Sequence, residues 1–471
     1  MTGRLRRAVV CGSALVAAFA FPASASAHGI VGRADLPIPA WLFSWTAVVV
    51  LIVSFVALST LWTTPRLQGA RSRRLFAVTP RLELVGNAIG LGLFALVVYS
   101  GLAGAQVPSA NFSVTFIYVI FWVGLPVASV LFGDVFRVFN PWRSTARLVG
   151  LIWHRRLGRS RRTYPSRFGV WPAVAVLVGF GWLELVYVPA DRERPSTLAW
   201  LSIGYFVVMV LGMLAFGVDD WESGADGFSV YFNLLSRLAA LTWRDGVAYL
   251  RTPLSGLANL EQRAGTVGLI CAIIGTTTFD GASNGAYWRD VEPSLVSMWQ
   301  SLGFGQTPAI ELAYSVGLAF CIVLIAAIYQ VGVRGMHSVS TRYGTAELTR
   351  TFAHTLAPIG FAYVFAHYFS YLIWQSQAIG YLISDPLGNG ANLFGTGGAQ
   401  IDYTIVSFAA IWYVQVATLV AGHVGGLALA HDRALVLYTD VAEATRSQYW
   451  MLAVMVAFTS FGLWLLSAVG T

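Results

Sequence analysis

The chain has 471 residues, of which 56% are hydrophobic and 11% are charged, and its formal net charge is +8. Soluble proteins carry about 25% charged residues, so the composition excludes an ordinary soluble domain and predicts many membrane-spanning helices. All 30 basic residues are arginine. Without lysine the chain has neither a Walker-A nucleotide site nor a Schiff-base cofactor. The arginines are concentrated in a few loops, so we expect neither a nucleotide nor a nucleic acid as partner.

Residues 1–27 have the pattern of a secretory signal peptide. Three arginines precede an apolar run that ends at Phe21, and the small residues ASA at 25–27 form a cleavage site. Cleavage there would leave His28 as the mature N-terminus, where its amine and imidazole together suit copper or zinc. The alternative is that His28 is an incidental first residue. We therefore divide the chain into a signal peptide, 1–27, and one integral membrane domain, 28–471.

Ten apolar runs of membrane length follow in chain order. They lie at 40–62, 86–106, 112–133, 168–190, 197–217, 265–280, 308–333, 351–383, 403–430 and 447–469. The segments 228–250 and 291–305 are less apolar and predict amphipathic helices near the membrane surface. The expected fold is all-α: a polytopic transmembrane bundle of about ten spans, with short interfacial helices.

Arginine placement sets the expected orientation, because positively charged loops stay in the cytoplasm. The loops 63–85 and 134–167 are the most arginine-rich. With a cleaved signal the chain starts outside, and ten spans return it to the same side. We predict a cell-membrane protein with the lipid bilayer as partner and with both mature termini extracytoplasmic.

One apolar segment, 350–385, carries an unusual number of polar side chains. On a helix Tyr363, His367, Ser370 and Trp374 share a face, since positions three, four and seven apart stack. Polar groups at membrane depth tend to face a bundle interior or a wet cavity. The face therefore indicates either hydrogen bonding between packed helices or a site.

Three carboxylates, Glu184, Asp280 and Glu311, lie near the outer ends of their spans when depth is counted at about 1.5 Å per residue. His367 lies nearer the midplane. One hypothesis is a cavity open to the outer face, in which Asp280, Glu311 and His367 bind a divalent metal and His28 can reach the same ion. Such ligands suit zinc, manganese, iron or copper. Glu184 and Asp280 are then the catalytic acids. The alternative is that each acid pairs separately with a neighbouring Arg, Trp or backbone N–H.

Two further motifs carry weaker signals. The sequence GASNG at 281–285 matches G-x-S-x-G around Ser283, but a membrane helix precedes it where a nucleophile elbow needs a strand. The sequence GDVFRVFNPWR at 133–143 places Asp134 three residues before Arg137, which predicts an ion pair. We favour a glycine-rich turn for the first motif and a lipid-headgroup anchor for the second.

Several stretches are together characteristic: AHGIVGRADLPIP, NPWR, WLELVY, TTFDGAS, LAPIGFAYVFAHYFSYLIWQSQ, SDPLGNG and WYVQVATLVAGHVGGLALAHDRA. They resemble a family of bacterial multi-pass membrane proteins that carry the label fenitrothion hydrolase. The resemblance implies hydrolysis of hydrophobic organophosphate-type esters, and it transfers no set of catalytic residues. Such an enzyme needs an activated water and an electrophile, which the outer carboxylates and His367 could supply with a metal. The alternatives are a transporter, a copper- or metal-handling protein, and a scaffold whose polar residues only pack helices.

Overall fold

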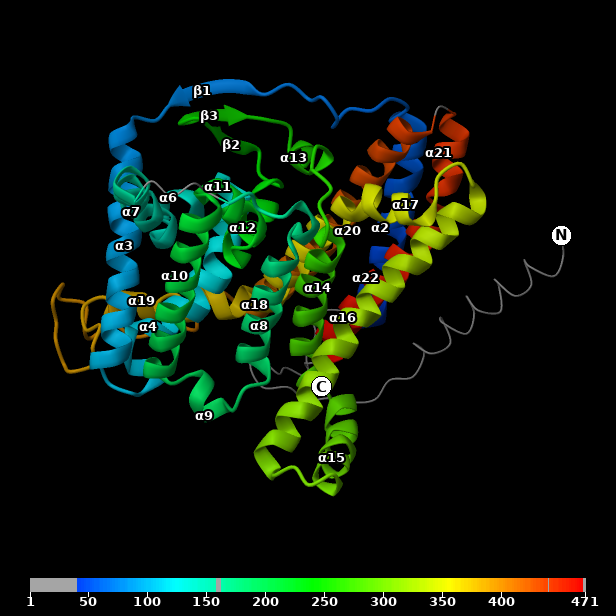
Figure 1. Ribbon diagram of the computed structural model, residues 1–471. Coiled ribbons are helices and arrows are strands. Elements are labelled where there is room, and N and C mark those ends of the chain that lie inside the picture. The colour runs from blue at the N-terminus through cyan, green and yellow to red at the C-terminus, as the bar shows by residue number, and fades with distance from the viewer. Residues whose placement is uncertain (1–39, 158–161, 439, 469–471) are drawn as a thin grey trace.

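Helices of up to 34 residues dominate the computed structural model, which describes residues 40–157, 162–438 and 440–468 (Figure 1). The first half of the chain contains α2 (Ala40–Leu61), β1 (Arg73–Ala77), α3 (Pro80–Ala103), η1 (Pro108–Ala110), α4 (Phe112–Thr115), η2 (Phe116–Gly124), α5 (Leu125–Phe132), α6 (Phe136–Phe139), α7 (Pro141–Leu157), η3 (Ser166–Phe168), α8 (Trp171–Leu185), α9 (Pro189–Arg192), α10 (Pro195–Phe216), α11 (Val218–Gly224) and α12 (Gly227–Ser236). The second half contains β2 (Leu241–Arg244), β3 (Val247–Leu250), α13 (Ser255–Ala258), α14 (Thr266–Ser283), α15 (Ala286–Ser301), α16 (Gln306–Val339), α17 (Thr345–Phe352), η4 (Ala353–Leu356), α18 (Ala357–Gln375), α19 (Ala378–Leu382), α20 (Phe408–Leu437), α21 (Val441–Ser447) and α22 (Tyr449–Ala468).

The helices have the length and apolar character of an integral membrane protein. Among the described residues, seven helical stretches are long and apolar enough to cross a membrane. They are Arg81–Ala103, Phe112–Phe132, Pro195–Phe216, Thr266–Ser283, Gln306–Val339, Thr345–Gln375 and Phe408–Leu437. Trp45–Leu61 and Trp171–Leu185 are shorter apolar helices, and α22 coincides with the tenth expected run. The helical membrane bundle is confirmed, whereas the count of ten spans stays a prediction. The expected signal peptide and His28 lie outside the described residues.

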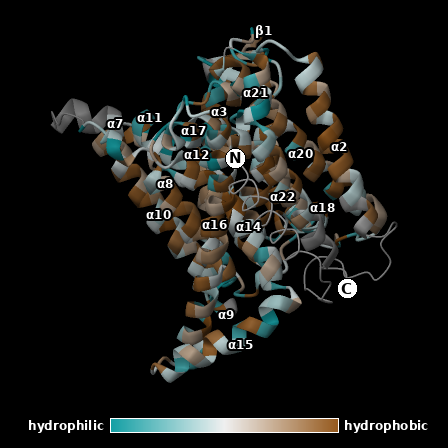
Figure 2. Ribbon diagram, turned by 90° about the vertical axis from the view of Figure 1, so that its right-hand side faces the viewer, coloured by the Kyte–Doolittle hydropathy of each residue, from teal (hydrophilic) through white to brown (hydrophobic). Residues whose placement is uncertain are grey.

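The sides of the long helices are apolar where they face outward. Figure 2 shows hydrophobic residues along most of α10, and its exposed side chains include Val207, Val208 and Leu211. In water such a surface would be unfavourable, but lipid tails are as apolar as these side chains. The exposed apolar surface is therefore the surface expected to contact the bilayer.

The bundle has two distinct ends (Figure 1). One end carries the three-stranded antiparallel sheet, ordered β1-β3-β2, together with α11 and α13, and we call it the sheet end. The other end carries α9 and α15, and we call it the α9 end. Both arginine-rich loops lie at the sheet end, since β1 belongs to the first and α6 to the second. The prediction that this end is cytoplasmic follows from that placement.

The segment 228–250 differs from its expected form. Instead of one interfacial amphipathic helix it contains the buried helix α12, followed by the hairpin of β2 and β3. The segment 291–305 overlaps α15, which is helical to Ser301 and has Pro293 within it. The first difference arises because the polar face of α12 lines a cavity.

Close helix packing positions the residues of the site. α18 packs against α20 where Gly422 meets Ala362 and the Pro358 carbonyl, and any side chain at 422 would collide with both. α8 packs against α14 where Gly181 faces Thr276 in the same way. Small residues allow membrane helices to approach closely. These contacts bring the ends of α8 and α14 beside the middle of α18.

Candidate functional site

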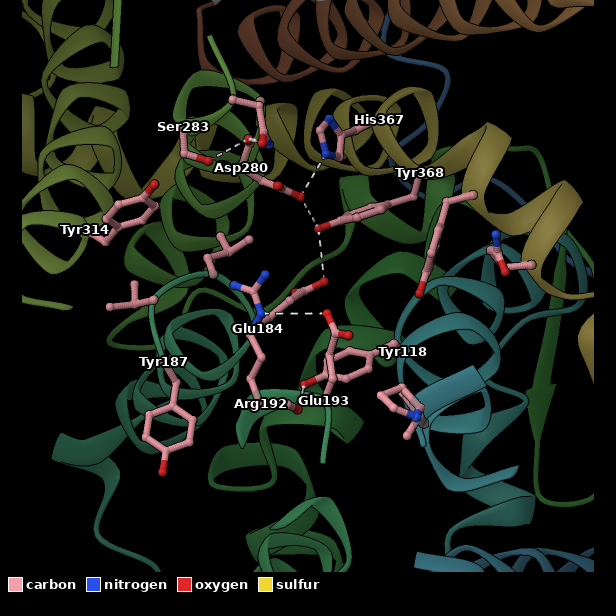
Figure 3. Close-up of a pocket in the computed structure, with 18 of the residues that line it drawn as sticks. Tyr118, Glu184, Tyr187, Arg192, Glu193, Asp280, Ser283, Tyr314, His367 and Tyr368 are labelled. Atoms are coloured by element: carbon pink, nitrogen blue, oxygen red, sulfur yellow. Dashed lines mark hydrogen bonds and ion pairs between the residues drawn. The ribbon is translucent and has the colours of Figure 1, made fainter. Parts of the chain in front are cut away.

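A cavity of about 600 Å³ lies toward the α9 end, between η2, α8, α9, α14, α16 and α18 (Figure 3). Its wall includes the polar side chains of Glu184, Arg192, Asp280, His367 and Tyr368. The η2 segment is π-helical, a wide geometry that often occurs at functional sites. A cavity of this size is ordinary for a small-molecule site.

A continuous hydrogen-bonded chain crosses the cavity wall. His367 Nε2 lies 2.8 Å from Asp280 Oδ2. The Tyr368 hydroxyl oxygen lies 2.7 Å from the same Asp280 oxygen and 3.3 Å from Glu184 Oε1. Figure 3 shows the four side chains pointing toward one another from three helices. Residues far apart in sequence are thereby joined into one acid–base network.

The local helix geometry explains why α18 contributes two neighbouring residues. Successive helical residues point about 100° apart, and the rings of His367 and Tyr368 are nearly perpendicular, at 89° with centroids 4.6 Å apart. Both rings therefore reach Asp280, near the end of α14. A tyrosine carries one phenolic proton, yet Tyr368 contacts two carboxylates. Both hydrogen bonds can form at once only when one of the two carboxyl groups carries a second proton.

Several polar atoms of the site have no partner. Glu184 Oε2 and Trp122 Nε1 are buried without a hydrogen bond. A buried polar atom left unpaired costs about 1–3 kcal/mol, so a fold that keeps such atoms usually has a use for them. His367 Nδ1 likewise makes no hydrogen bond to any part of the chain that the structure describes. Glu184 and His367 both line the cavity, so a ligand or water there can supply the hydrogen bonds that they lack.

A single arginine stands among the acids of this wall. Arg192, at the end of α9, lines the cavity and lies 3.9 Å from a carboxylate oxygen of Glu193. Its backbone carbonyl accepts the hydroxyl of Tyr118 at 2.7 Å, which ties α9 to η2. A guanidinium has no neutral form at physiological pH. Arg192 therefore supplies a fixed positive charge to a ligand in the cavity.

The structure brings together three of the five residues that the sequence analysis assigned to the site: Glu184, Asp280 and His367. Glu311 lies on α16 and is absent from the cavity wall, although its neighbour Ile310 lines it. His28 lies outside the described residues, so its role stays a prediction. Sequence position gave the depth of Glu311 but not its rotation about the helix axis.

The metal hypothesis finds limited support in this geometry. Among the described residues no group of three His, Cys, Asp or Glu side chains is arranged to hold a metal ion. Asp280 and His367 are hydrogen-bonded to each other, and Glu184 reaches them only through Tyr368. Divalent metals in catalytic sites usually have about three protein ligands. A zinc, manganese, iron or copper ion therefore stays a prediction for this site.

Ser283 lines the same cavity but lacks the geometry of a nucleophile. It is the last residue of α14, and its hydroxyl donates to the Asp280 carbonyl one turn earlier, at 3.0 Å. The nucleophile elbow places its serine on a sharp turn between a strand and a helix. Here the serine ends a helix, which agrees with the glycine-rich turn favoured from sequence.

The motif at 133–143 forms a second polar network, at the sheet end. Asp134 accepts from Asn233 at 2.8 Å, and Arg137 lies 3.5 Å from Asp219 rather than pairing with Asp134. Arg143 is 2% exposed and pairs with Asp219 and Glu222. The motif is therefore largely internal, where a lipid-headgroup anchor was expected.

Sequence reasoning missed two contributors to the α9-end cavity, Arg192 and Tyr368. The available signals were weak. Tyr368 follows His367 directly, and Arg192 belongs to an outer loop where positive charge is unusual. A tyrosine or tryptophan in an apolar span is ordinarily a packing residue, so its polar atom attracts attention only once its surroundings are known.

Comparison of the chain with protein-family models, with curated proteins and with solved structures finds no match. The functional argument therefore depends on the site itself.

Proposed function

We propose that the α9-end cavity hydrolyses small apolar esters, organophosphate triesters among them, by acid–base catalysis. The observation that supports this proposal most directly is the pair formed by His367 and Asp280. His367 Nε2 is hydrogen-bonded to the carboxylate, and Nδ1 has no partner among the described residues. A carboxylate that accepts from one nitrogen of an imidazole fixes its tautomer and leaves the other nitrogen as a base. The resemblance to fenitrothion hydrolases agrees with this reaction class.

In the proposed reaction His367 Nδ1 takes a proton from water while the water oxygen bonds to phosphorus or to an acyl carbon. The bond to the leaving oxygen breaks, and the leaving group departs with that electron pair. Asp280 stabilises the imidazolium that forms, and Arg192 faces the negative charge that develops on the ester oxygens. The network through Tyr368 to Glu184 returns a proton to the leaving group. Water and ester are consumed, and an acid and an alcohol or phenol are formed.

The metal-dependent form of this function stays a prediction. Asp280 and His367 would have to exchange their mutual hydrogen bond for metal ligation, with water as the remaining ligand. We assign no step to a metal. Turnover that falls with a chelator and returns with added zinc or manganese would support the metal-dependent form.

The test uses the purified full chain in lipid nanodiscs with an aryl phosphotriester and an aryl carboxylic ester. We expect turnover in the natural protein and a loss of 10²–10⁴-fold in His367→Asn, the usual contribution of a general base. His337→Asn is the matched control, because His337 lies at the sheet-side end of α16 and binds the Tyr343 carbonyl. Folded protein that hydrolyses neither ester, or equal rates in His367→Asn and the control, would refute the proposal.

A further inference from the structure

A second cavity, of about 370 Å³, lies toward the sheet end. Its charged lining consists of five acids and three arginines, so it is net acidic. The α9-end cavity also has an acidic lining, with Glu184, Glu193 and Asp280 against Arg192. Acidic cavities concentrate cations and repel anions. Both cavities are therefore suited to a positively charged species.

The two cavities lie along the same helices. The start of α14 lines the sheet-end cavity through Thr266 and Leu269, and its end lines the other through Asp280. α8 also extends between the cavities. Val170, at its N-terminal cap, lines the sheet-end cavity, and Glu184, near its end, lines the other. At about 1.5 Å per residue, Leu269 and Asp280 are about 16 Å apart along α14. Only part of the membrane thickness of about 30 Å separates the cavities.

Helix α12 lines the sheet-end cavity and packs against α8 and α18, both of which reach the α9-end cavity. Four of its residues line the sheet-end cavity, namely Ser229, Val230, Asn233 and Leu234, and Arg237 at its C-terminal cap lines it too. Tyr231 lies on a different face and is buried, and its hydroxyl has no partner. Burial raises the pKa of Tyr231, and the charge of Glu184 raises it further. The rings of Phe180 and Phe228, with centroids 5.4 Å apart, place α12 against α8 about one helical turn before Glu184.

Aromatic rings fill the space around this tyrosine. Trp122 lies 5.5 Å from Tyr231 and 4.6 Å from Phe180, measured between ring centroids. Phe228 lies 5.4 Å from Phe180 and 4.8 Å from Phe121. These aromatic side chains pack closely around the Tyr231 ring. A proton can still cross by transfer between polar atoms, and three unpaired ones lie here: Glu184 Oε2, Trp122 Nε1 and Tyr231 OH.

We propose that the two cavities are the mouths of one pathway that carries protons across the protein, with Glu184 and Asp134 as proton-holding groups and the Tyr231 hydroxyl between them. Asp134 lines the sheet-end cavity and accepts from Asn233 on α12 at 2.8 Å. The Glu184 carboxyl gives its proton to the Tyr231 oxygen as the phenolic proton passes to water and then to Asp134. Each group regains its starting form when the next proton enters, so no atom or electron is consumed.

This activity is a narrower form of the carrier considered from sequence, and it needs no ester. The test uses the full chain in liposomes that contain potassium and a pH-sensitive dye. Valinomycin imposes the membrane potential that drives protons, and the dye reports the flux. We expect flux above that of empty liposomes, reduced at least tenfold in Glu184→Gln, Asp134→Asn and Tyr231→Phe.

The variant Tyr231→Phe is the sharpest of these, because it keeps the packed ring and removes only a hydroxyl without a partner. Tyr249→Phe, on the exposed hairpin, and Glu83→Gln, an exposed acid on α3, are the matched controls and should retain full flux. Hydrolysis should persist in Tyr231→Phe, so the two proposals fail separately. No flux, equal flux in Tyr231→Phe, or flux of sodium in place of protons would overturn the pathway.

Discussion

Two acids inside the bundle have opposite surroundings. Asp226, at the sheet end, is fully buried and accepts five hydrogen bonds: from Tyr205 at 2.7 Å, the Ser229 amide at 3.2 Å, the Ser229 hydroxyl at 2.6 Å, Trp142 at 2.5 Å and Asn140 at 3.3 Å. Among the described residues Glu184, at the α9 end, has one hydrogen-bond partner, the Tyr368 hydroxyl at 3.3 Å, and its second oxygen has none. One carboxylate is saturated by the fold and the other is left open beside a cavity.

The difference separates structural acids from candidate functional ones. A buried charge is tolerated when hydrogen bonds replace its hydration, and Asp226 meets that condition within the protein. Asp432 does as well, since one of its oxygens accepts the backbone N–H groups of Arg66 and Leu67 at 2.6 and 3.0 Å. Glu184 meets that condition only when a ligand or water in the cavity donates a hydrogen bond to it. An incompletely satisfied acid next to a cavity is therefore the better guide to function.

The largest expected effect is on catalysis at the unsatisfied end. Asp280→Asn removes the carboxylate charge that orients and stabilises His367, so we expect hydrolysis of the aryl ester to fall by about 10²–10⁴-fold. The melting temperature should change little, because both contacts of the Asp280 side chain go to one oxygen, Oδ2, whose place the amide oxygen of asparagine can take. Steady-state kinetics together with a thermal melt in nanodiscs check both expectations. Unchanged turnover would remove Asp280 from the mechanism.

The reverse pattern is expected at the saturated end. Asp226→Asn replaces an oxygen that faces Trp142, Asn140 or Ser229 with an amide that cannot accept from them. Because hydrogen bonds to charged groups contribute about 1.5–3 kcal/mol each, we expect the free energy of unfolding to fall by about 3 kcal/mol. Denaturant unfolding of the solubilised protein measures this loss. A variant as stable as the natural chain would show that the saturated network is not structural.

Two arginines of α7 extend the comparison from acids to bases, because one forms a buried ion pair and the other an exposed one. Arg143 is 2% exposed and pairs with Glu222, which is 12% exposed, whereas Arg147 and Glu83 are 43% and 50% exposed at a distance of 2.9 Å. Removing one partner of a buried pair costs about 3–5 kcal/mol, and an exposed pair is worth at most about 1 kcal/mol. We expect Arg143→Met to destabilise the protein by about 3 kcal/mol, with Arg147→Met as the matched control. Equal losses would contradict the assigned burial.

The smallest expected effect concerns pH. Burial raises the pKa of Asp134 above its ordinary value of 3.8, so in the window above that value the folded state binds more protons than the unfolded state. The stability contributed by the protonated form is lost as pH rises through the folded pKa. Asp134→Asn should therefore gain stability relative to the natural chain as the pH rises from about 4 to about 7. Unfolding free energies of both proteins at the two pH values measure the gain, and a constant difference would refute the shift.

Depths calculated from the helical rise along each expected span identified several residues of the cavity wall. Counting helical rise placed Glu184 and Asp280 near one end of their spans, and both acids do lie in one cavity wall with His367. Counting failed for Glu311, because rise gives height and not rotation, and the orientation of α16 is set by its packing on α14 and α15. Tyr368 was missed because a phenol in an apolar helix has no sequence pattern that separates packing from hydrogen bonding.

The segment 228–250 shows why the fold was only partly predictable. Its mixed polarity indicated a helix at the membrane surface, the usual place for such a pattern. In the structure α12 is buried, and its Ser229 and Asn233 instead line the sheet-end cavity. Hydropathy cannot distinguish an external aqueous surface from an internal one, and only tertiary packing decides between them.

The most direct test compares Asp280→Asn with Asp226→Asn in one preparation, measuring ester turnover and unfolding free energy for both. We expect Asp280→Asn to lose turnover and keep its stability, while Asp226→Asn loses stability. Two variants that lose stability alike and keep the same turnover per folded molecule would contradict the distinction between the two ends of the bundle.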